Sequence, residues 1–285
     1  GTVVPQIAGG RLTTESGVAV STANRTAQSI IYYTPFTGAQ IALYDGFTWA
    51  YHAFAEISFT LTGLTNAKLY DVFVYDNAGV KTMELSAAWA SNTARTDAVV
   101  RQDGVWVKSG DKTRRLVGTI GTTGTTTTED GPRRFVANAV KSSMVPRGMQ
   151  ALEGTDSQPY PTNTWRQFMS DAAMQCEFIV SVQQEQAEAQ VIASIGLQGN
   201  TGTLAAGVAV GFDSTTTPSG THNSGYNNAA SFNIAPSAGQ FRTTPAIGYH
   251  FFAMLQFGIA GTTCLFYGDN GATDIQSGIT ATIIS

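Results

Sequence analysis

The sequence predicts an all-β protein made of two antiparallel modules of the β-sandwich or jelly-roll kind, together with one short helix. Short runs in which apolar and polar residues alternate recur along the chain, as in Val80–Leu85. Such alternation puts successive side chains on opposite faces of a strand. Only 13% of the 285 residues are charged whereas 42% are apolar, and this balance suits sheets joined by tight turns.

Two hairpins are the clearest local elements. Tyr70–Tyr75 alternates, Asp76–Gly79 supplies turn residues, and Val80–Leu85 alternates again, so the two strands are expected to pair antiparallel. Around the strand Val105–Lys108, an Asp-Gly pair and a Ser-Gly pair mark a turn on either side. These pairs are strong short-range hairpin signals.

One short helix is predicted in the N-terminal half. Asn92 is a favourable N-cap for a helix over Thr93–Val100, in which Ala94, Ala98 and Val99 would share one face. The rest of the chain is predicted to be strand, turn or loop, so this helix is a minor element of the fold.

The chain divides into an arm and two domains. Residues 1–10 contain Pro and paired Gly and are interpreted as an N-terminal arm that lies across a neighbouring subunit, a frayed terminus being the alternative. Residues 11–143 form the predicted N-terminal β domain and residues 144–285 the C-terminal β-sandwich domain. The boundary is placed before Met144–Gln150, where charge and composition both change.

The two halves differ in charge. Residues 1–147 carry 14 Lys and Arg against 11 Asp and Glu, a balance of +3, whereas residues 148–285 carry 2 against 9, a balance of −7. A chain with opposite potentials at its two ends favours ordered packing against further copies. An equally weighted alternative is that the charge difference only reflects a drift in surface composition along the chain.

Two polar segments are predicted to be exposed loops that project outward. Residues 122–132 are rich in Thr and Gly, and residues 213–228 are almost entirely Ser, Thr, Gly, Asn and Pro. Long loops on a rigid β frame often carry binding residues. The candidate binding residues are therefore taken from the second loop: Asp213, Thr221, His222, Asn223, Tyr226 and Asn227.

A basic region lies between residues 101 and 147, with nine of the sixteen basic residues against four acids. Its residues straddle turns and the protein is acidic overall, so nucleic-acid binding is not expected. Contacts with a neighbouring subunit or with the acidic second half are expected instead. The predicted inter-subunit cluster consists of Arg114, Arg115, Arg133, Arg134 and Arg147.

No reactive centre is predicted. The nucleophile-elbow pattern, the phosphate-binding loop and the dinucleotide-binding glycine pattern are absent. His52, His222 and His250 match no metal-ligand spacing. Asp71 and Asp76 with a neighbouring Glu56 could form the carboxylate pair of a glycoside hydrolase, but strand and turn roles explain them better. We therefore expect no enzyme activity, no metal and no cofactor.

The remaining apolar signals concern cysteines, aromatic residues and membranes. Cys176 and Cys264 each lie in a strand-like run and are expected to be small buried residues, with a disulfide as the alternative.

Phe47, Trp49 and Tyr51 alternate on one face, which favours core packing over a ligand-stacking strip. No apolar run is long enough to span a membrane, so no membrane insertion is expected.

Ten segments spread over nearly the whole chain carry motifs that are fairly specific as a set. They are Arg11–Gly17, Tyr32–Phe36, Leu43–Gly46, Tyr70–Gly79, Gln102–Gly110, Arg114–Gly124, Asp213–Thr216, Gly248–His250, Tyr267–Gly271 and Gln276–Thr280. Together these motifs resemble a group of tailed-bacteriophage and prophage proteins described as tail-fibre-like or uncharacterised virion proteins.

The resemblance implies a virion structural protein and brings no catalytic residues. The favoured expectation is a trimeric tail-fibre or spike module that is assembled in the host cytoplasm, contacts other virion proteins and binds a host-surface glycan. One alternative is a capsid decoration protein whose N-terminal arm and basic region lock capsomers together. A polysaccharide depolymerase is the last alternative, because no convincing acid pair is present.

Overall fold

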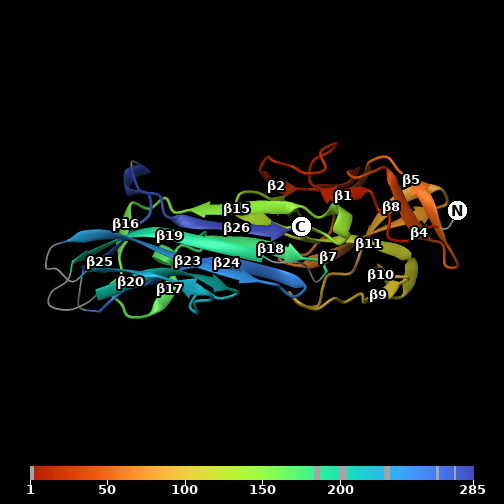
Figure 1. Cartoon of the computed structure of the whole chain (residues 1–285). Helices are drawn as coiled ribbons and strands as arrows, with labels where there is room; N and C mark the ends of the chain where they lie inside the picture. The colour runs from red at the N-terminus through yellow and green to blue at the C-terminus, as the bar shows by residue number, and fades with distance from the viewer. Residues whose placement is uncertain (1–2, 183–186, 199–203, 228–231, 261–262, 273) are drawn as a thin grey trace.

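The computed structural model describes residues 3–182, 187–198, 204–227, 232–260, 263–272 and 274–285. Figure 1 shows an elongated molecule with the N-terminal half at one end and the C-terminal half at the other. The prediction of an all-β fold is confirmed, because antiparallel sheets make up nearly all the regular structure. Within the described residues the helical elements are three 3₁₀ turns: η1 (Lys141–Ser143), η2 (Phe168–Ser170) and η3 (Asn270–Ala272). None of them is long enough to cross a membrane.

The N-terminal half contains three sheets. Each is antiparallel, and its strands are named in the order in which they are hydrogen-bonded to one another. The sheets are β1 (Gly10–Thr13), β3 (Ile30–Pro35) and β6 (Ile57–Thr60); β4 (Gln40–Tyr44) and β5 (Trp49–Ala53); and β8 (Val80–Leu85), β7 (Leu69–Asn77), β11 (Asp111–Gly121), β10 (Val105–Lys108) and β9 (Val99–Gln102), with β14 (Val136–Asn138) also paired to β11.

The C-terminal half is a sandwich of two sheets. The first sheet begins with three strands of the N-terminal half and runs β2 (Arg25–Gln28), β12 (Thr127–Glu129), β13 (Arg133–Arg134), β18 (Gln175–Val180), β24 (Gly248–Phe257), β20 (Leu204–Phe212) and β22 (Ser224–Asn227), with β17 (Trp165–Gln167) also on β24. The second runs β15 (Pro146–Leu152), β26 (Gly278–Ile284), β19 (Ala187–Gln198), β23 (Asn233–Thr243) and β21 (Thr221–His222), with β25 (Thr263–Tyr267) on β19 and β16 (Ser157–Pro159) on β25.

Each half has its own core. In the C-terminal sandwich, inward-facing residues such as Phe252, Ile195 and Phe266 are fully buried between the two sheets. In the N-terminal half, Val72 and Ile120 lie in a second cluster. Burying side chains of this size stabilises the fold by about 1.5–3 kcal/mol each, so these two clusters supply much of the driving force for folding.

The two halves are joined by a shared sheet and by shared apolar clusters. Strand β13 pairs in parallel with β18, and in the first sheet this pair links strands of the two halves. Trp89 and Phe135 of the N-terminal half pack with Ile179 of the C-terminal half. Phe73 packs in the same way with Val182. The predicted boundary between residues 143 and 144 falls at the end of η1, directly before β15.

Both predicted hairpins are present. Strands β7 and β8 pair from Val72–Leu85 to Asn77–Val80, so Ala78 and Gly79 form a two-residue turn, and both have positive φ, 51° and 95°. Strands β9 and β10 are joined in the same way by Asp103 and Gly104. Positive φ at both turn positions suits the right-handed twist of the strands, and glycine adopts it without strain.

The prediction of a helix over Thr93–Val100 is wrong. Val99 and Val100 belong to β9 and pair with β10, which is consistent with the preference of β-branched residues for strands. The Asn92 carbonyl accepts the Tyr249 N–H at 2.9 Å, and the Arg95 side chain points to a buried carboxylate. These long-range contacts outweigh a weak local helix signal.

The prediction that residues 122–132 form an exposed loop is also wrong. Thr127, Thr128, Glu129 and Asp130 are at most 5% exposed, and the first three form β12 between β2 and β13. Threonine is a good strand residue, and the pairing satisfies the backbone polar groups that burial removes from water.

The N-terminal segment is docked on its own chain. Ala8 bridges to Ile41, and the Ile7 carbonyl accepts the Ala42 N–H at 2.8 Å. Arg115, only 2% exposed, donates to the carbonyls of Pro5, Gln6, Ile7 and Ala42 at 2.7–3.1 Å. A single guanidinium therefore holds the start of the chain against β4, because its fork of donors meets several acceptors at once.

The core interpretation of the aromatic run is wrong for two of its three residues. Phe47 is 89% exposed in the turn between β4 and β5, and Tyr51 is 40% exposed on β5. Among the described strands β5 pairs with β4 alone, so it lies in a two-stranded sheet. Trp49 is half-buried, lies 5.4 Å from Tyr44 and donates its indole N–H to Asp103 at 2.8 Å.

Both cysteines are free and buried, as the first interpretation expected, and burial raises the pKa of each thiol to about 12. Since the thiolate is the reactive form, we expect neither Cys176 nor Cys264 to react with iodoacetamide in the folded protein at pH 8. Both should react after unfolding in urea. Mass spectrometry of the two samples checks this, and modification of the folded protein at either position would contradict the burial.

Candidate functional site

The outer face of the second C-terminal sheet carries an in-register row of uncharged polar side chains. Gln150 is paired with Thr280, Thr280 with Gln190, Gln190 with Gln240, and Gln240 with Thr221. All five side chains are exposed. Since neighbouring strands lie 4.7–4.9 Å apart, this polar row extends for about 19 Å across the sheet.

Apolar groups follow the polar row along the strands. Two residues further along, Leu152 is 50% and Ile192 is 56% exposed. Further still, Phe232 lies over Gly196, where a Cβ would come within 2.2 Å of the Phe232 ring. Only glycine leaves room for the ring at this place. The outer face thus changes from amides and hydroxyls to aliphatic and aromatic groups.

The outer face contains a hollow of about 620 Å³. Among the described residues that line it, none is Asp, Glu, Lys or Arg. Beyond one side of the polar row, Glu188 and Arg242 pair with each other. Amides and hydroxyls beside apolar groups can hydrogen-bond and pack against an uncharged ligand, and this is the composition expected of a small-ligand or saccharide site.

Three of the sequence-predicted binding residues meet this outer face. Thr221 belongs to the polar row, and His222 and Asn223 line the hollow. Asn223 fastens the edge of the sheet, because its N–H donates to the Ala238 carbonyl at 2.9 Å and its Oδ1 accepts the Ala238 N–H at 2.6 Å. The His222 ring lies edge-on to Trp165 at 5.1 Å.

The structure does not place the other candidates at the hollow. Tyr226 and Asn227 lie in β22, which pairs with β20 in the first sheet. Asp213 accepts a hydrogen bond from the Phe251 N–H at 3.0 Å and lies 2.8 Å from Nδ1 of His250. Residues 221–227 also form strands β21 and β22, so the predicted loop is partly regular structure.

No metal site is formed by the residues that the structure describes. None of their His, Cys, Asp and Glu side chains gather in a group of three or more that could hold an ion. Of the weighed hydrolase carboxylates, Asp71 is fully buried, Asp76 pairs with Lys81 at 2.8 Å, and Glu56 accepts hydrogen bonds from residues 16, 17 and 34. Each has a structural role of its own.

The predicted basic cluster is engaged within the chain. Arg114 pairs with Glu84 at 2.9 Å and Asp111 at 3.1 Å, and its guanidinium lies 3.6 Å above the Tyr75 ring. Arg115 holds the N-terminal segment, and burial lowers its pKa to about 10. Arg114 and Arg115 are adjacent in the sequence, but their side chains contact different parts of the fold.

The other three arginines lie near two buried acids, Glu129 and Asp130. Arg147 lies 3.8 Å from Glu129, which is 2% exposed. Arg134 donates to the Asp130 and Gly148 carbonyls, and Arg133 forms an ion pair with the Asp130 carboxylate. Charges this deeply placed are normally paired, and these pairs are found inside one chain.

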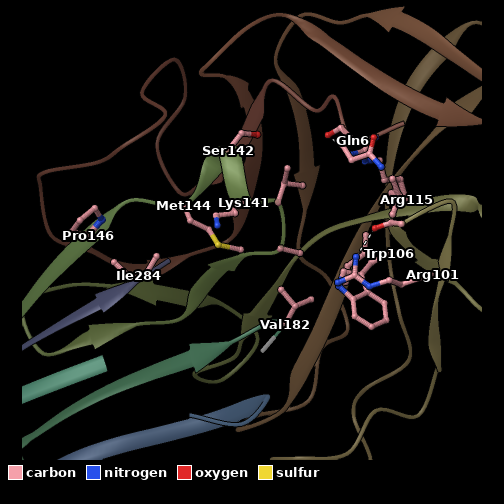
Figure 2. A pocket seen from close by; sticks show the side chains of 15 residues that line it. Gln6, Arg101, Trp106, Arg115, Lys141, Ser142, Met144, Pro146, Val182 and Ile284 are labelled. Atoms are coloured by element: carbon pink, nitrogen blue, oxygen red, sulfur yellow. Dashed lines mark hydrogen bonds between the residues drawn. The ribbon is translucent and has the colours of Figure 1, made fainter. Parts of the chain in front are cut away.

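A larger hollow, the central cleft, lies where the two halves meet and has a volume of about 1050 Å³. Figure 2 shows Arg101 and Trp106 on one side, Lys141 and Ser142 on another, and Arg115 beside Gln6. The remaining lining residues are mostly apolar: Gly104, Val105, Leu116, Ala139, Val140, Met144, Pro146, Val182 and Ile284. Sequence reasoning missed this cleft, because its lining comes from segments far apart in the chain.

Comparison with known proteins gives no family. No family model matches the sequence, and no curated protein matches it. Among solved structures, the functional form of the mosquito-larvicidal Cry4Aa toxin from Bacillus thuringiensis is similar at 9% identity and a TM-score of 0.20. The match covers 93% of this chain and 50% of the toxin chain, so this chain spans half the length of that protein. A TM-score this low supports no argument about function.

Proposed function

We propose that the protein is a structural component of a bacteriophage virion, a tail-fibre or spike module that attaches to a host-surface glycan and carries no catalytic centre. It acts in the assembled particle, after assembly in the host cytoplasm, as a homotrimer in contact with other virion proteins. The observation that carries the proposal is the uncharged outer face with its polar row. The motif resemblance to virion proteins supports the same role.

The chemistry of the outer face favours a saccharide. The amides of Gln150, Gln190 and Gln240 each offer donors and an acceptor, and they face solvent in one row. Sugar hydroxyls need such partners, while the less polar faces of a sugar ring pack against groups such as Ile192 and Leu152. The row lies on paired strands, so its geometry is set before a ligand arrives, which lowers the entropy cost of binding.

Attachment is preferred to capsid decoration because of two observations. The decoration role depends on a free N-terminal arm and on an available basic region. Residues 4–9 instead contact their own chain, and the five predicted arginines contact partners within the chain. Electron microscopy of antibody-labelled particles tests the choice: label at the tail supports attachment, whereas label on the capsid lattice supports decoration.

Replacing two amides of the polar row is expected to weaken attachment. We expect the double variant Gln190→Ala/Gln240→Ala to bind host cells and surface polysaccharides about tenfold more weakly, because each lost hydrogen bond contributes about 0.5–1.5 kcal/mol. Thermal stability should be unchanged, since both side chains are exposed. The measurement is binding of the labelled protein to cells and to an array of bacterial polysaccharides.

Gln40→Ala is the matched control, because Gln40 is an exposed strand residue of the N-terminal half, away from the outer face. It should bind like the unaltered protein. Equal binding by all three proteins would show that the outer face is not the binding site. An absence of binding to any cell or polysaccharide would count against attachment itself.

A further inference from the structure

We propose that the outer face binds an extended, linear polysaccharide chain that crosses the strands and places one sugar unit over each of them. The saccharide class rests on the attachment role proposed above, whereas the direction and the shape of the bound chain are argued from the register of the sheet. The outer face is formed by β15, β26, β19, β23 and β21, which are hydrogen-bonded side by side in this order.

The hollow on the outer face is lined by two parallel rows of residues. One is the polar row, all of whose members line the hollow. The other, the apolar row, lies two residues away on each strand, at a distance of about 7 Å. It consists of Leu152, Gly278, Ile192 and Ala238, and Asn223 continues it on β21. Because both rows run across the strands, the hollow is a trough that crosses all five of them.

The two rows offer a crossing ligand a similar pair of groups on successive strands. On β15 the pair is Gln150 and Leu152, and on β19 it is Gln190 and Ile192. A ligand that ran along β19 would instead meet the charged Glu188, then an amide and then an aliphatic group. A polymer of repeated units is recognised best by a surface that repeats with it, so the chain is expected to cross the strands.

The spacing of the strands sets the shape of the bound chain. Neighbouring strands lie about 4.7–4.9 Å apart, and sugar units joined through equatorial bonds advance by nearly the same length, because the two linking oxygens of each ring point in opposite directions. A chain with axial bonds coils, so its units lose register with the rows. An extended peptide presents side chains to one face about every 7 Å, which does not match the spacing of the strands.

The sheet holds the groups of the trough in place. A Cβ on Gly278 would lie 2.9 Å from Cδ2 of Leu152, so Leu152 leans over this glycine and extends the apolar row toward Ile192. The last strand is fixed by Asn223, which hydrogen-bonds the Ala238 carbonyl at 2.9 Å and the Ala238 N–H at 2.6 Å. Five strands fixed in this way offer five subsites that are formed before a ligand arrives.

The test measures the binding of cello-oligosaccharides and malto-oligosaccharides of two to six units by nuclear magnetic resonance titration of the full chain. Both series consist of glucose, but each link is fully equatorial in the first and contains one axial bond in the second. We expect the affinity for the cello series to rise about threefold with each unit, because each unit reaches one more hydrogen-bonding group. The rise should level off at five units. Cellopentaose should bind at least tenfold more tightly than maltopentaose.

Two variants locate the chain on the trough. Gln150→Ala removes the polar group at one end of the row, so the affinity should level off at four units, and binding of cellopentaose should weaken more than binding of cellotriose. Gln190→Ala should weaken binding of every length from three units upward, because three consecutive subsites always include the central strand β19. Gln40→Ala is again the control and should leave all affinities unchanged.

Three results would each overturn the inference: no binding of the cello series, equal binding of the two series, or an affinity that does not rise with length. Failure of the proposed function is recognised separately. Length-dependent binding of the cello series upholds the inference even if the protein attaches to no cell. Attachment to cells that depends on Gln190 and Gln240, without a preference for the cello series, overturns the inference alone.

Discussion

Asp71→Ala is expected to lower the free energy of unfolding by about 3–5 kcal/mol, because it leaves a buried arginine without its carboxylate. Asp71 is fully buried and accepts from Arg95 at 2.7 and 3.2 Å and from the Thr119 hydroxyl at 2.7 Å. Arg95 also donates to the Ser181 carbonyl, so the pair connects strand β7 with the C-terminal half. Urea unfolding followed by tryptophan fluorescence measures the change.

Asp76→Asn is the control, because Asp76 lies near the end of the same strand and pairs with Lys81 in a partly exposed position. Exposed pairs contribute about 0–1 kcal/mol, so this variant should be nearly as stable as the unaltered protein. Equal unfolding free energies for Asp71→Ala and Asp76→Asn would contradict the structural role assigned to Asp71.

Arg115→Met is expected to release the N-terminal segment and to lower the free energy of unfolding by about 2–4 kcal/mol, since four backbone carbonyls, among them the buried carbonyl of Ala42, lose a donor. Methionine has a similar length but donates no hydrogen bond. Limited proteolysis should then cut within residues 3–9 while the rest of the chain resists. Mass spectrometry of the fragments and urea unfolding provide the two measurements.

Arg114→Met tests whether position rather than charge matters. Arg114 is adjacent in sequence, but it is partly exposed and forms surface ion pairs, so its loss should cost about 1 kcal/mol or less. A segment that stays resistant to protease in Arg115→Met would show that Arg115 does not anchor it.

The local elements of the fold could be predicted from the sequence, because their causes are local. Glycine at the second turn position and alternation on both sides fix the β7–β8 and β9–β10 hairpins within a few residues. The false helix arose from the same local reasoning. No residue near Asn92 in the sequence indicates that its carbonyl accepts a hydrogen bond from the Tyr249 N–H, more than 150 residues further on.

The candidate sites could not be assembled from the sequence in the same way. The polar row joins residues 150, 280, 190, 240 and 221, and a shift of one residue in any strand would turn its side chain to the core. Glutamine at an exposed strand position is the only sign of the polar row in the sequence, and it does not reveal the register in which the strands pair. The residues around Thr221 predict a loop, whereas the structure places Thr221 in strand β21 at the end of the row.

The parallel pair of β13 with β18 bears on how the molecule transmits force. A hinge between the halves would have to break this pair, separate Trp89 from Ile179 and break the hydrogen bond from Arg95 to the Ser181 carbonyl. Bending between the halves would therefore cost considerable free energy, and we expect the two halves to move as one rigid body. A mechanical force applied to the outer face would then be transmitted to the N-terminal half without bending the molecule between the halves.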